Sequence, residues 1–427
     1  MLFSAITILN EHFDIEKNVD VRIKDGKIAT ISKTPLEVET GERVISGAGK
    51  LLMPGLANPH CHVPMTLLRG RGEGLDLWSW LSTAIFPFEA QLTEDDIKVG
   101  TRLGLLEMIA SGVTTFTEMY FEIAGIIDVL EASKIRANVC HGVNASPEPL
   151  AERKGIIDTL QMVKRLGDNR GRVRVDMGLH AEYTSDEVTV RGIADIAREH
   201  DLIVHVHISE TANDHRQCIE RHNMTPIAWM QHCGVLDSPI IAAHCVHVSD
   251  DDLATMAGAK VTPVHCISSN LKLGSGVARL GDWEKAGITY AIGTDGAASN
   301  NNLNFFEEMH LVSLVHKGVS GDPTFLQPKT LLKAATRAGY LAQRRPDGGL
   351  IKEGFAADLA VIDLDRPHLL PENDLASHLV HSAQATDVYM TIVGGDVLYE
   401  NGEFKTIDAE RAMADAKRVT AAILARM

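Results

Sequence analysis

The 427-residue chain has 45% hydrophobic residues and a formal net charge of −16, so it can bury a large core and exceeds the usual length of one domain. The negative charge is spread without a long acidic run, which argues against nucleic acid or an anionic membrane as a partner and leaves small ligands open. Six cysteines without a CxxC pair, an amino terminus without a signal-peptide pattern, and no apolar run of roughly eighteen residues lead us to expect a cytoplasmic protein.

Short strands are predicted at both ends of the chain. The segment "VDVRIKDGKIATIS" alternates apolar and polar residues around Asp25-Gly26, a pair typical of a hairpin turn. Short strand-like runs separated by turn residues occur again in "AADLAVIDLD" and "DVYMTIVGGDVLYENGEF". We therefore expect the two termini to pair in one sheet assembly around an inserted larger domain. Residues 406–427 have helical periodicity with Asp408 near their start, which predicts a terminal helix.

The middle of the chain alternates helical stretches with apolar strand-like runs. Examples are "LGLLEMIASG" followed by "VTTFTE", and "IADIAREHD" followed by "LIVHVHISE". This alternation predicts parallel β/α units. Roughly eight such units over ~250 to 300 residues favour a closed (β/α)8 barrel over an open sheet.

Two histidines stand one residue apart in "PGLANPHCH", where an apolar run ends. On a strand, residues two apart face the same side, so His60 and His62 can present both rings to one point, as a metal ion requires. An isolated HxH pattern is more often a pair of ordinary hydrogen-bonded histidines. The spacing alone therefore does not decide between a structural and a metal-binding role.

The same placement recurs at three later strand ends. "LIVHVHISE" carries His205 and His207 and is followed by Glu210, "IIAAH" ends in His244, and "ITYAIGTD" ends in Asp295. In a barrel the active site forms at the carboxyl ends of the strands, so these segments are expected to converge. Buried histidines and a buried aspartate without a shared purpose are costly to satisfy, which favours one joint site.

Three imidazoles and one carboxylate with an open position suit zinc, one ion per subunit, although iron(II) or another divalent ion could occupy the same set. Such an ion lowers the pKa of bound water. Asp295 could contact the metal and accept the water's proton, while Glu210 and His244 could deliver protons to the substrate and the leaving group. The sequence therefore predicts a metal-dependent hydrolase.

Several segments carry a resemblance to a known family. They are "PGLANPHCH", "SGVTTFTEMYF", "HISETANDH", "IIAAHCVHVSDDDL", "SSNLKLGSG" and "GTDGAASNNNLNFFEEM". Over essentially its full length the chain resembles the amidohydrolase superfamily and, within it, the methylthioadenosine/S-adenosylhomocysteine deaminases. The resemblance implies a (β/α)8 TIM barrel at 54–353, a small β-sandwich from 1–53 and 354–405, and a terminal helix at 406–427. It also implies one metal held by His60, His62, His207 and Asp295, which selects His207 over His205.

The resemblance further implies roles around the substrate, an adenine nucleoside. Glu210 matches the residue that protonates a purine ring nitrogen, and His244 the residue that orients the attacking water. Glu89 in "FPFEAQ" matches a carboxylate that binds a ribose hydroxyl, and His180 in "GLHAEYTSD" a histidine that reaches the sugar. Without the match, Glu89 would read as a solvated loop carboxylate and His180 as a satisfied core histidine.

The chain departs from the family pattern at a few positions. Glu182 stands where the family usually has proline, and Cys266-Ile267 replace its usual Asn-Pro. His141 stands where the family often has an arginine that holds the polar end of the substrate. A largely neutral imidazole does not reproduce a guanidinium clamp on a carboxylate. We therefore expect adenosine, methylthioadenosine or 5′-deoxyadenosine to be better substrates than S-adenosylhomocysteine. Arg153 is a candidate to replace the family's arginine, but the sequence does not place it.

The predicted function is hydrolytic deamination of an adenine nucleoside to its inosine derivative and ammonia. An alternative is an aminohydrolase of a free base, such as guanine, a pterin or a triazine; it becomes the better candidate if Glu89 and His180 do not reach the pocket. Two-metal cyclic amide hydrolysis normally needs a bridging lysine, which "RVRVDMGLHAEY" lacks. A silent scaffold would have lost ligands, and none is lost. A homo-oligomer is compatible with the sequence, but no apolar stripe specifies a number.

Overall fold

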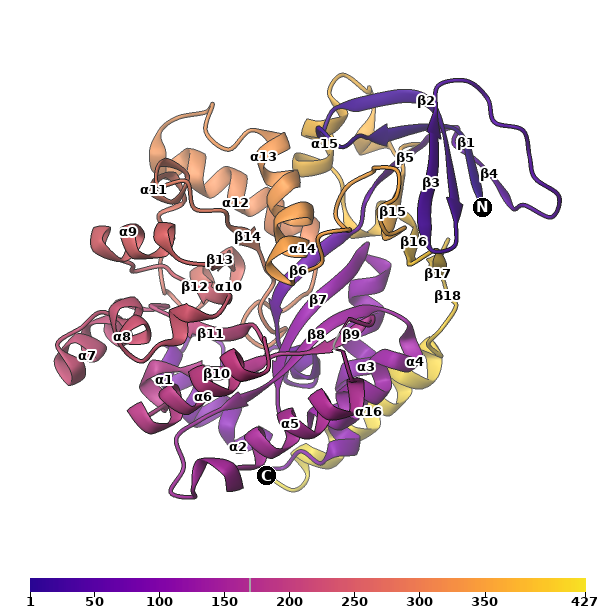
Figure 1. The fold of residues 1–427 in the computed structure, drawn as a ribbon. Helices are drawn as coiled ribbons and strands as arrows, with labels where there is room; N and C mark the ends of the chain where they lie inside the picture. Colours follow the sequence, from indigo (N-terminus) through magenta and orange to yellow (C-terminus); the bar gives the residue numbers. More distant parts are fainter. Residues whose placement is uncertain (169) are drawn as a thin grey trace.

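Two nine-stranded β-sheets organise the chain in the computed structural model, which describes residues 1–168 and 170–427. One sheet is a parallel barrel that fills the middle of the molecule, and the other is built from strands of both termini (Figure 1). The predicted fold class, a (β/α)8 barrel beside a β-structure from both chain ends, is confirmed.

The barrel consists of eight strands that pair in parallel with their neighbours, and β9 (Val173–Val175) lies beside β8. In order they are β6 (Leu56–Cys61), β7 (Val113–Tyr120), β8 (Arg136–Val143), β10 (Met177–Ala181), β11 (Val204–Ile208), β12 (Ile240–His244), β13 (Val261–His265) and β14 (Ala291–Ile292). Most of their residues are buried, because helices cover the outside while side chains fill the interior.

The barrel closes between its last and first strands through backbone contacts next to the predicted site. The Asp295 backbone N–H donates to the carbonyl oxygen of His60 at 3.1 Å. Two residues before His60 on β6, the Asn58 side chain accepts from the backbone N–H of Thr294 at 3.0 Å and donates to the Thr294 hydroxyl at 2.7 Å. Closure therefore places Asp295 against the end of β6, where His60 lies.

The second sheet joins β1 (Leu2–Leu9), β2 (Ile15–Lys24), β3 (Lys27–Ser32), β4 (Val44–Ser46) and β5 (Lys50–Pro54) to β15 (Leu359–Asp363), β16 (Val388–Val393), β17 (Asp396–Glu400) and β18 (Glu403–Phe404). The two chain ends meet where β5 pairs antiparallel with β15. β5 leads through Gly55 into β6, so this sheet adjoins the start of the barrel strands, away from the histidines. A Cβ on Gly55 would meet the Thr114 side chain at 2.1 Å, which explains the glycine at this junction.

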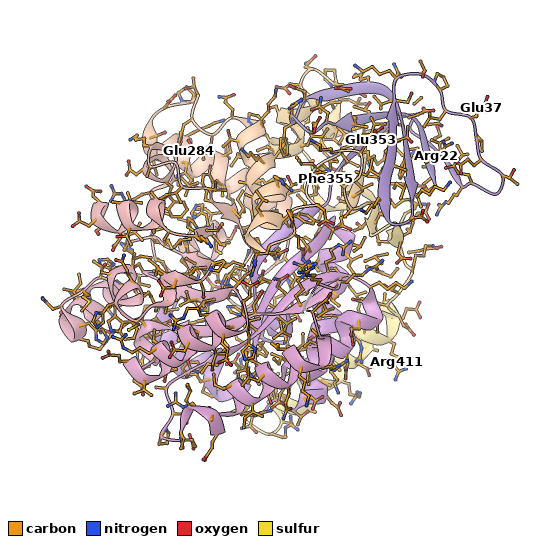
Figure 2. All side chains as sticks on the ribbon, viewed as in Figure 1. Arg22, Glu37, Glu284, Glu353, Phe355 and Arg411 are labelled. Carbon is orange, nitrogen blue, oxygen red and sulfur yellow. The ribbon has the colours of Figure 1, made fainter. Side chains whose placement is uncertain are left out.

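Side chains anchor the loops of the terminal sheet. Arg22 of β2 donates to the Glu42 carboxylate at 2.9 Å and also bonds the carbonyl oxygen of Glu37, which ties the loop between β3 and β4 to the sheet. The Glu353 carboxylate accepts from the backbone N–H of Ile31 at 2.7 Å, so the connection into β15 is bonded to β3. Figure 2 labels Arg22, Glu37 and Glu353 in this region.

The longer helices are α3 (Glu94–Ala110), α4 (Ile123–Ser133), α5 (Lys154–Leu166), α6 (Glu187–Glu199), α7 (Ala212–His222), α8 (Pro226–His232), α9 (Asp250–Gly258), α12 (Phe305–Ser320), α15 (Leu375–His381) and α16 (Ala409–Leu424). Shorter ones are α1 (Leu77–Trp80), α2 (Phe86–Glu89), α10 (Ile267–Lys272), α11 (Leu280–Lys285), α13 (Pro328–Lys333) and α14 (Gly339–Ala342). The Asp408 side chain caps α16 by accepting from the backbone N–H of Arg411, and α16 packs beside α3 (Figure 1).

Single turns of 3₁₀ or π type complete the helical elements. They are η1 (Val63–Leu68), η2 (Leu81–Ile85), η3 (Leu150–Glu152), η4 (Glu182–Thr184), η5 (Val235–Asp237), η6 (Ala334–Ala338), η7 (Pro367–Leu369) and η8 (Ala385–Asp387). Among the described residues, no helix combines the length and apolar character needed to cross a bilayer. All six cysteines are unpaired and buried.

Candidate metal centre and active-site pocket

The four predicted metal ligands come together at the carboxyl end of the barrel. His60 Nε2 lies 3.4 Å from Asp295 Oδ1, and His62 Nε2 lies 3.3 Å from the same oxygen. His62 Nε2 is 3.2 Å from His207 Nε2. These separations are close to those between donors that share one ion at about 2.0–2.2 Å.

The remaining nitrogens of two of these rings show where their protons lie. His62 Nδ1 donates to the carbonyl oxygen of Met119, and His207 Nδ1 to that of His180, both at 2.6 Å. A carbonyl only accepts, so in the neutral rings both Nε2 atoms carry lone pairs, and these face each other at 3.2 Å. A cation between the two atoms turns this repulsion into two bonds.

His60 points to the same conclusion. Its ring is fully buried, and its Nε2 has no hydrogen-bond partner. Burial lowers the pKa of His60 to about 4, so the ring is neutral and one of its two nitrogens carries a lone pair. A buried ring nitrogen without a partner is costly unless a ligand completes it. The residues present therefore fit a divalent cation.

The Asp295 carboxylate is held in place from several sides. The hydroxyls of Ser269 and Ser299 donate to Oδ2 at 2.6 and 3.0 Å, and the backbone N–H of Gly296 donates to Oδ1 at 2.7 Å. The residue has a φ of +60°, a conformation that non-glycine residues adopt rarely and that is often found at functional sites. This backbone turns the carboxylate from the end of β14 toward the histidines.

Glu210 and His244 form a second pair beside the cluster. His244 Nε2 lies 3.6 Å from Glu210 Oε2 and 4.0 Å from Asp295 Oδ2, while its Nδ1 bonds the side-chain oxygen of Asn270 at 2.8 Å. Burial raises the pKa of Glu210 to about 7, although the neighbouring His244 opposes the rise. Burial disfavours the charged His244 ring, but Glu210 and Asp295 outweigh it and raise its pKa. Glu210 can therefore donate or accept a proton near neutral pH.

One cavity, with about 760 Å³ of empty space including its open mouth, lies above the cluster. The predicted residues that line it are His62, Glu89, His180, His207, Glu210, His244 and Asp295, while His60 lies beneath. Its walls are largely apolar and aromatic, with Leu77, Trp80, Ile85, Phe86, Phe121, Tyr183 and Leu273 among them. Glu89 and His180 thus reach the pocket that holds Glu210 and Asp295.

Glu89 and His180 each have a fixed hydrogen-bond partner. The Tyr120 hydroxyl donates to Glu89 Oε1 at 2.7 Å, which leaves Oε2 for another donor. Burial raises the pKa of Glu89 to about 7, an effect that the bond from Tyr120 partly opposes. His180 Nδ1 bonds the hydroxyl of Thr184 at 2.9 Å.

No lysine or arginine is among the described residues that line the cavity. His141 lies outside the lining, with its Nδ1 3.5 Å from a carboxylate oxygen of Asp158. Arg153 is buried and donates to the carbonyl oxygens of Ser146 and Glu148 and to the hydroxyl of Thr189. Arg153 therefore holds its own loop together.

Comparison with known proteins follows this geometry. A model described as "Amidohydrolase family" matches residues 51–398. The chain belongs to the amidohydrolase family. The resemblance predicted from its motifs is confirmed by a relative from Acetivibrio thermocellus, named 5-methylthioadenosine/S-adenosylhomocysteine deaminase, which is 41% identical over 98% of each chain.

Two solved structures show the same architecture as this amidohydrolase. An adenosine deaminase from Xanthomonas campestris with bound zinc has a TM-score of 0.92 and 29% identity, covering 99% of this chain and 98% of its own. An atrazine chlorohydrolase from Arthrobacter aurescens TC1 complexed with zinc has a TM-score of 0.90 and 25% identity, covering 98% of this chain and 99% of its own.

Several supporting residues of the amidohydrolase site were not predicted. Tyr120, Ser269, Asn270 and Ser299 bond the side chains of Glu89, His244 or Asp295. All four lie in segments that carry the family resemblance, "SGVTTFTEMYF", "SSNLKLGSG" and "GTDGAASNNNLNFFEEM", and that was the available signal. Their partners depend on how strands and loops meet across the barrel, which spacing along the chain does not reveal.

Glu182, noted in the sequence as a departure from proline, has a structural role. Its buried carboxylate accepts from Arg221 at 3.0 Å and bonds Nε2 of His222 at 2.8 Å. Because both partners lie on α7, the contact ties the loop after β10 to the helix that follows Glu210.

Proposed function

We propose that this amidohydrolase hydrolytically deaminates an adenine nucleoside, giving the inosine derivative and ammonia. The observation that carries the proposal is that Glu89 and His180, the sugar-binding pair, share one cavity with Glu210 and Asp295. A free base has no sugar hydroxyls for Glu89 and His180 to bind. The names of the relative from Acetivibrio thermocellus and of the structural neighbour from Xanthomonas campestris support the same reaction.

We assign one divalent ion to His60, His62, His207 and Asp295, and zinc is the proposed ion because three imidazoles and a carboxylate suit it. Zinc is also named in the two structural neighbours. When bound, the ion supplies a water molecule that is activated as a nucleophile at neutral pH.

The chain's own residues carry the protons. Asp295 accepts a proton from the attacking water. His244, whose Nε2 lies 4.0 Å from Asp295 Oδ2, orients that water toward C6 of the purine. Glu210 donates a proton to the ring nitrogen N1, so negative charge does not accumulate in the ring. Asp295 then returns its proton to the amino group at C6, which leaves as ammonia, while the new hydroxyl at C6 gives its proton to Glu210 and becomes the carbonyl of the inosine product. Water is added, ammonia is released and both carboxyl groups return to their starting states, so atoms and charge balance.

A screen for ammonia release tests the proposed reaction. We expect turnover of adenosine, methylthioadenosine and 5′-deoxyadenosine, and a kcat/KM for S-adenosylhomocysteine about ten- to a hundredfold lower, because a charge-assisted hydrogen bond contributes about 1.5–3 kcal/mol and no lysine or arginine lines the described cavity to make one. Guanine, a pterin and a triazine serve as free-base controls. Faster turnover of any free base than of every nucleoside would replace the proposal with the alternative.

The reaction is expected to slow as pH rises above about 7, the pKa of Glu210. Burial raises this pKa, and the protonated form is the acid that the reaction uses, so activity is present below the pKa and is lost as pH rises through it. A kcat/KM profile for adenosine between pH 5 and pH 9, about two units on each side, would measure the alkaline limb. Activity that keeps rising across this range would contradict Glu210 as the acid.

A further inference from the structure

The Nδ1 atom of His60 has a different kind of hydrogen-bond partner from the Nδ1 atoms of the other two histidines in the assigned ligand set. His62 and His207 each donate their Nδ1–H to a backbone carbonyl. His60 Nδ1 instead lies 2.8 Å from Nε2 of His205, a fully buried residue of β11. His205 stands two residues before His207 on the same strand, so both side chains point into the barrel, with His205 deeper.

The roles of the surrounding atoms give this contact a direction. A lone pair on His60 Nε2 requires the proton on Nδ1, so Nε2 of His205 must accept it. His205 then carries its own proton on Nδ1, which lies 3.5 Å from the sulfur of Cys140. The Cys140 thiol in turn donates to the carbonyl oxygen of Glu118 at 3.3 Å. Every donor in this series of hydrogen bonds thus has an acceptor. The series runs from His60 through His205 and Cys140 to the backbone carbonyl of Glu118 on β7.

We propose that His205 is a positioning residue for the metal centre, which fixes the tautomer and the ring orientation of His60. The proposal rests on the ligand set assigned under the proposed function. His205 is not among the residues that line the cavity, so its effect passes through His60. Loss of such a hydrogen-bond partner typically costs about 10–100-fold in metal affinity.

The test compares two substitutions of His205 in the full-length protein. His205→Leu removes the acceptor and fills part of the space of the ring with an apolar side chain. His205→Gln places an amide oxygen near the position of Nε2. Zinc affinity is measured by competition with a chelator on metal-stripped protein, with circular dichroism as a check on folding. We expect His205→Leu to bind zinc about 10–100-fold more weakly, and His205→Gln to recover most of the loss.

Two further measurements separate positioning from packing. At saturating zinc, His205→Leu should regain most of its kcat, because the groups that contact the substrate are unchanged. His265→Leu is the matched control: His265 is also fully buried on a barrel strand, but it bonds His316 on α12 at 3.0 Å. We expect this control to change zinc affinity little. If His205→Leu does not fold, Cys140→Ala, which removes the partner of His205 Nδ1, takes its place with an expected smaller loss.

The outcomes that overturn the proposal are distinct. Zinc affinity of His205→Leu equal to that of the unmodified protein, or of His205→Gln as low as that of His205→Leu, would remove the role of the hydrogen bond. An equal loss in His265→Leu would assign the effect to packing. An unmodified protein that binds no zinc would overturn the assigned ligand set itself, and with it the proposal.

Discussion

Glu210→Gln is expected to lower kcat for adenosine deamination by about 10²–10⁴-fold, the usual contribution of a positioned general acid. Glutamine keeps the size and polarity of the side chain but cannot donate a carboxylic proton. Glu210 is only 3% exposed, and its pKa is raised to about 7, so the protonated form is well populated at neutral pH. The loss should therefore appear in kcat, because the proton transfer belongs to the chemical step.

Zinc binding separates this effect from damage to the metal centre. Glu210 Oε2 lies 3.6 Å from His244 Nε2, and Glu210 is outside the assigned ligand set, so Glu210→Gln should hold the same amount of zinc as the unmodified protein. Glu284→Gln, at an exposed carboxylate on α11 that is labelled in Figure 2, is the matched control and should leave kcat unchanged. Near-full activity of Glu210→Gln would remove this residue from the mechanism.

The barrel could be predicted because several of its strands end in the same way. Apolar runs give strands that are buried on both faces, and polar residues follow them at the carboxyl end, as His244 does after "IIAAH". The alternation of these runs with helical stretches then indicates the parallel connections. Leu77 and Glu89 lie on the 4-residue helices α1 and α2, which are too short to show a helical periodicity in the sequence.

Within the site, the sequence located the strand ends but not the contacts across them. His205 and His207 alternate on β11 and point the same way, and they differ only in depth inside the barrel. Spacing therefore could not choose between them, whereas the hydrogen bond from His60 Nδ1 to His205 shows that His205 lies behind the cluster. The bond from Asn270 to His244 likewise joins residues 26 positions apart in the chain.

Removing the metal is expected to abolish turnover and to lower the melting temperature by several degrees. Without a cation, the lone pairs of His62 and His207 face each other at 3.2 Å, and His60 Nε2 stays buried without a partner. Binding that occurs only in the folded state stabilises that state by about 4 kcal/mol when the free ion is at a thousand times its dissociation constant. Chelator treatment, elemental analysis and thermal melts with and without added zinc measure both effects.

Asp295→Asn tests whether the loss of turnover and the loss of thermal stability arise at this site rather than at a distant one. Asparagine preserves the shape of the side chain and can still accept from Ser269, but it lacks the negative charge that strengthens the binding of a divalent ion and cannot take the proton of the attacking water. The variant should therefore lose turnover, and added zinc should raise its melting temperature much less than that of the unmodified protein. Ser268→Ala removes the hydroxyl next to Ser269, which is not among the groups bonded to Asp295, so this variant is the matched control and should retain both properties. Full activity in protein shown to be free of metal would contradict the assignment, because the arrangement of four side chains around one point would then need another explanation.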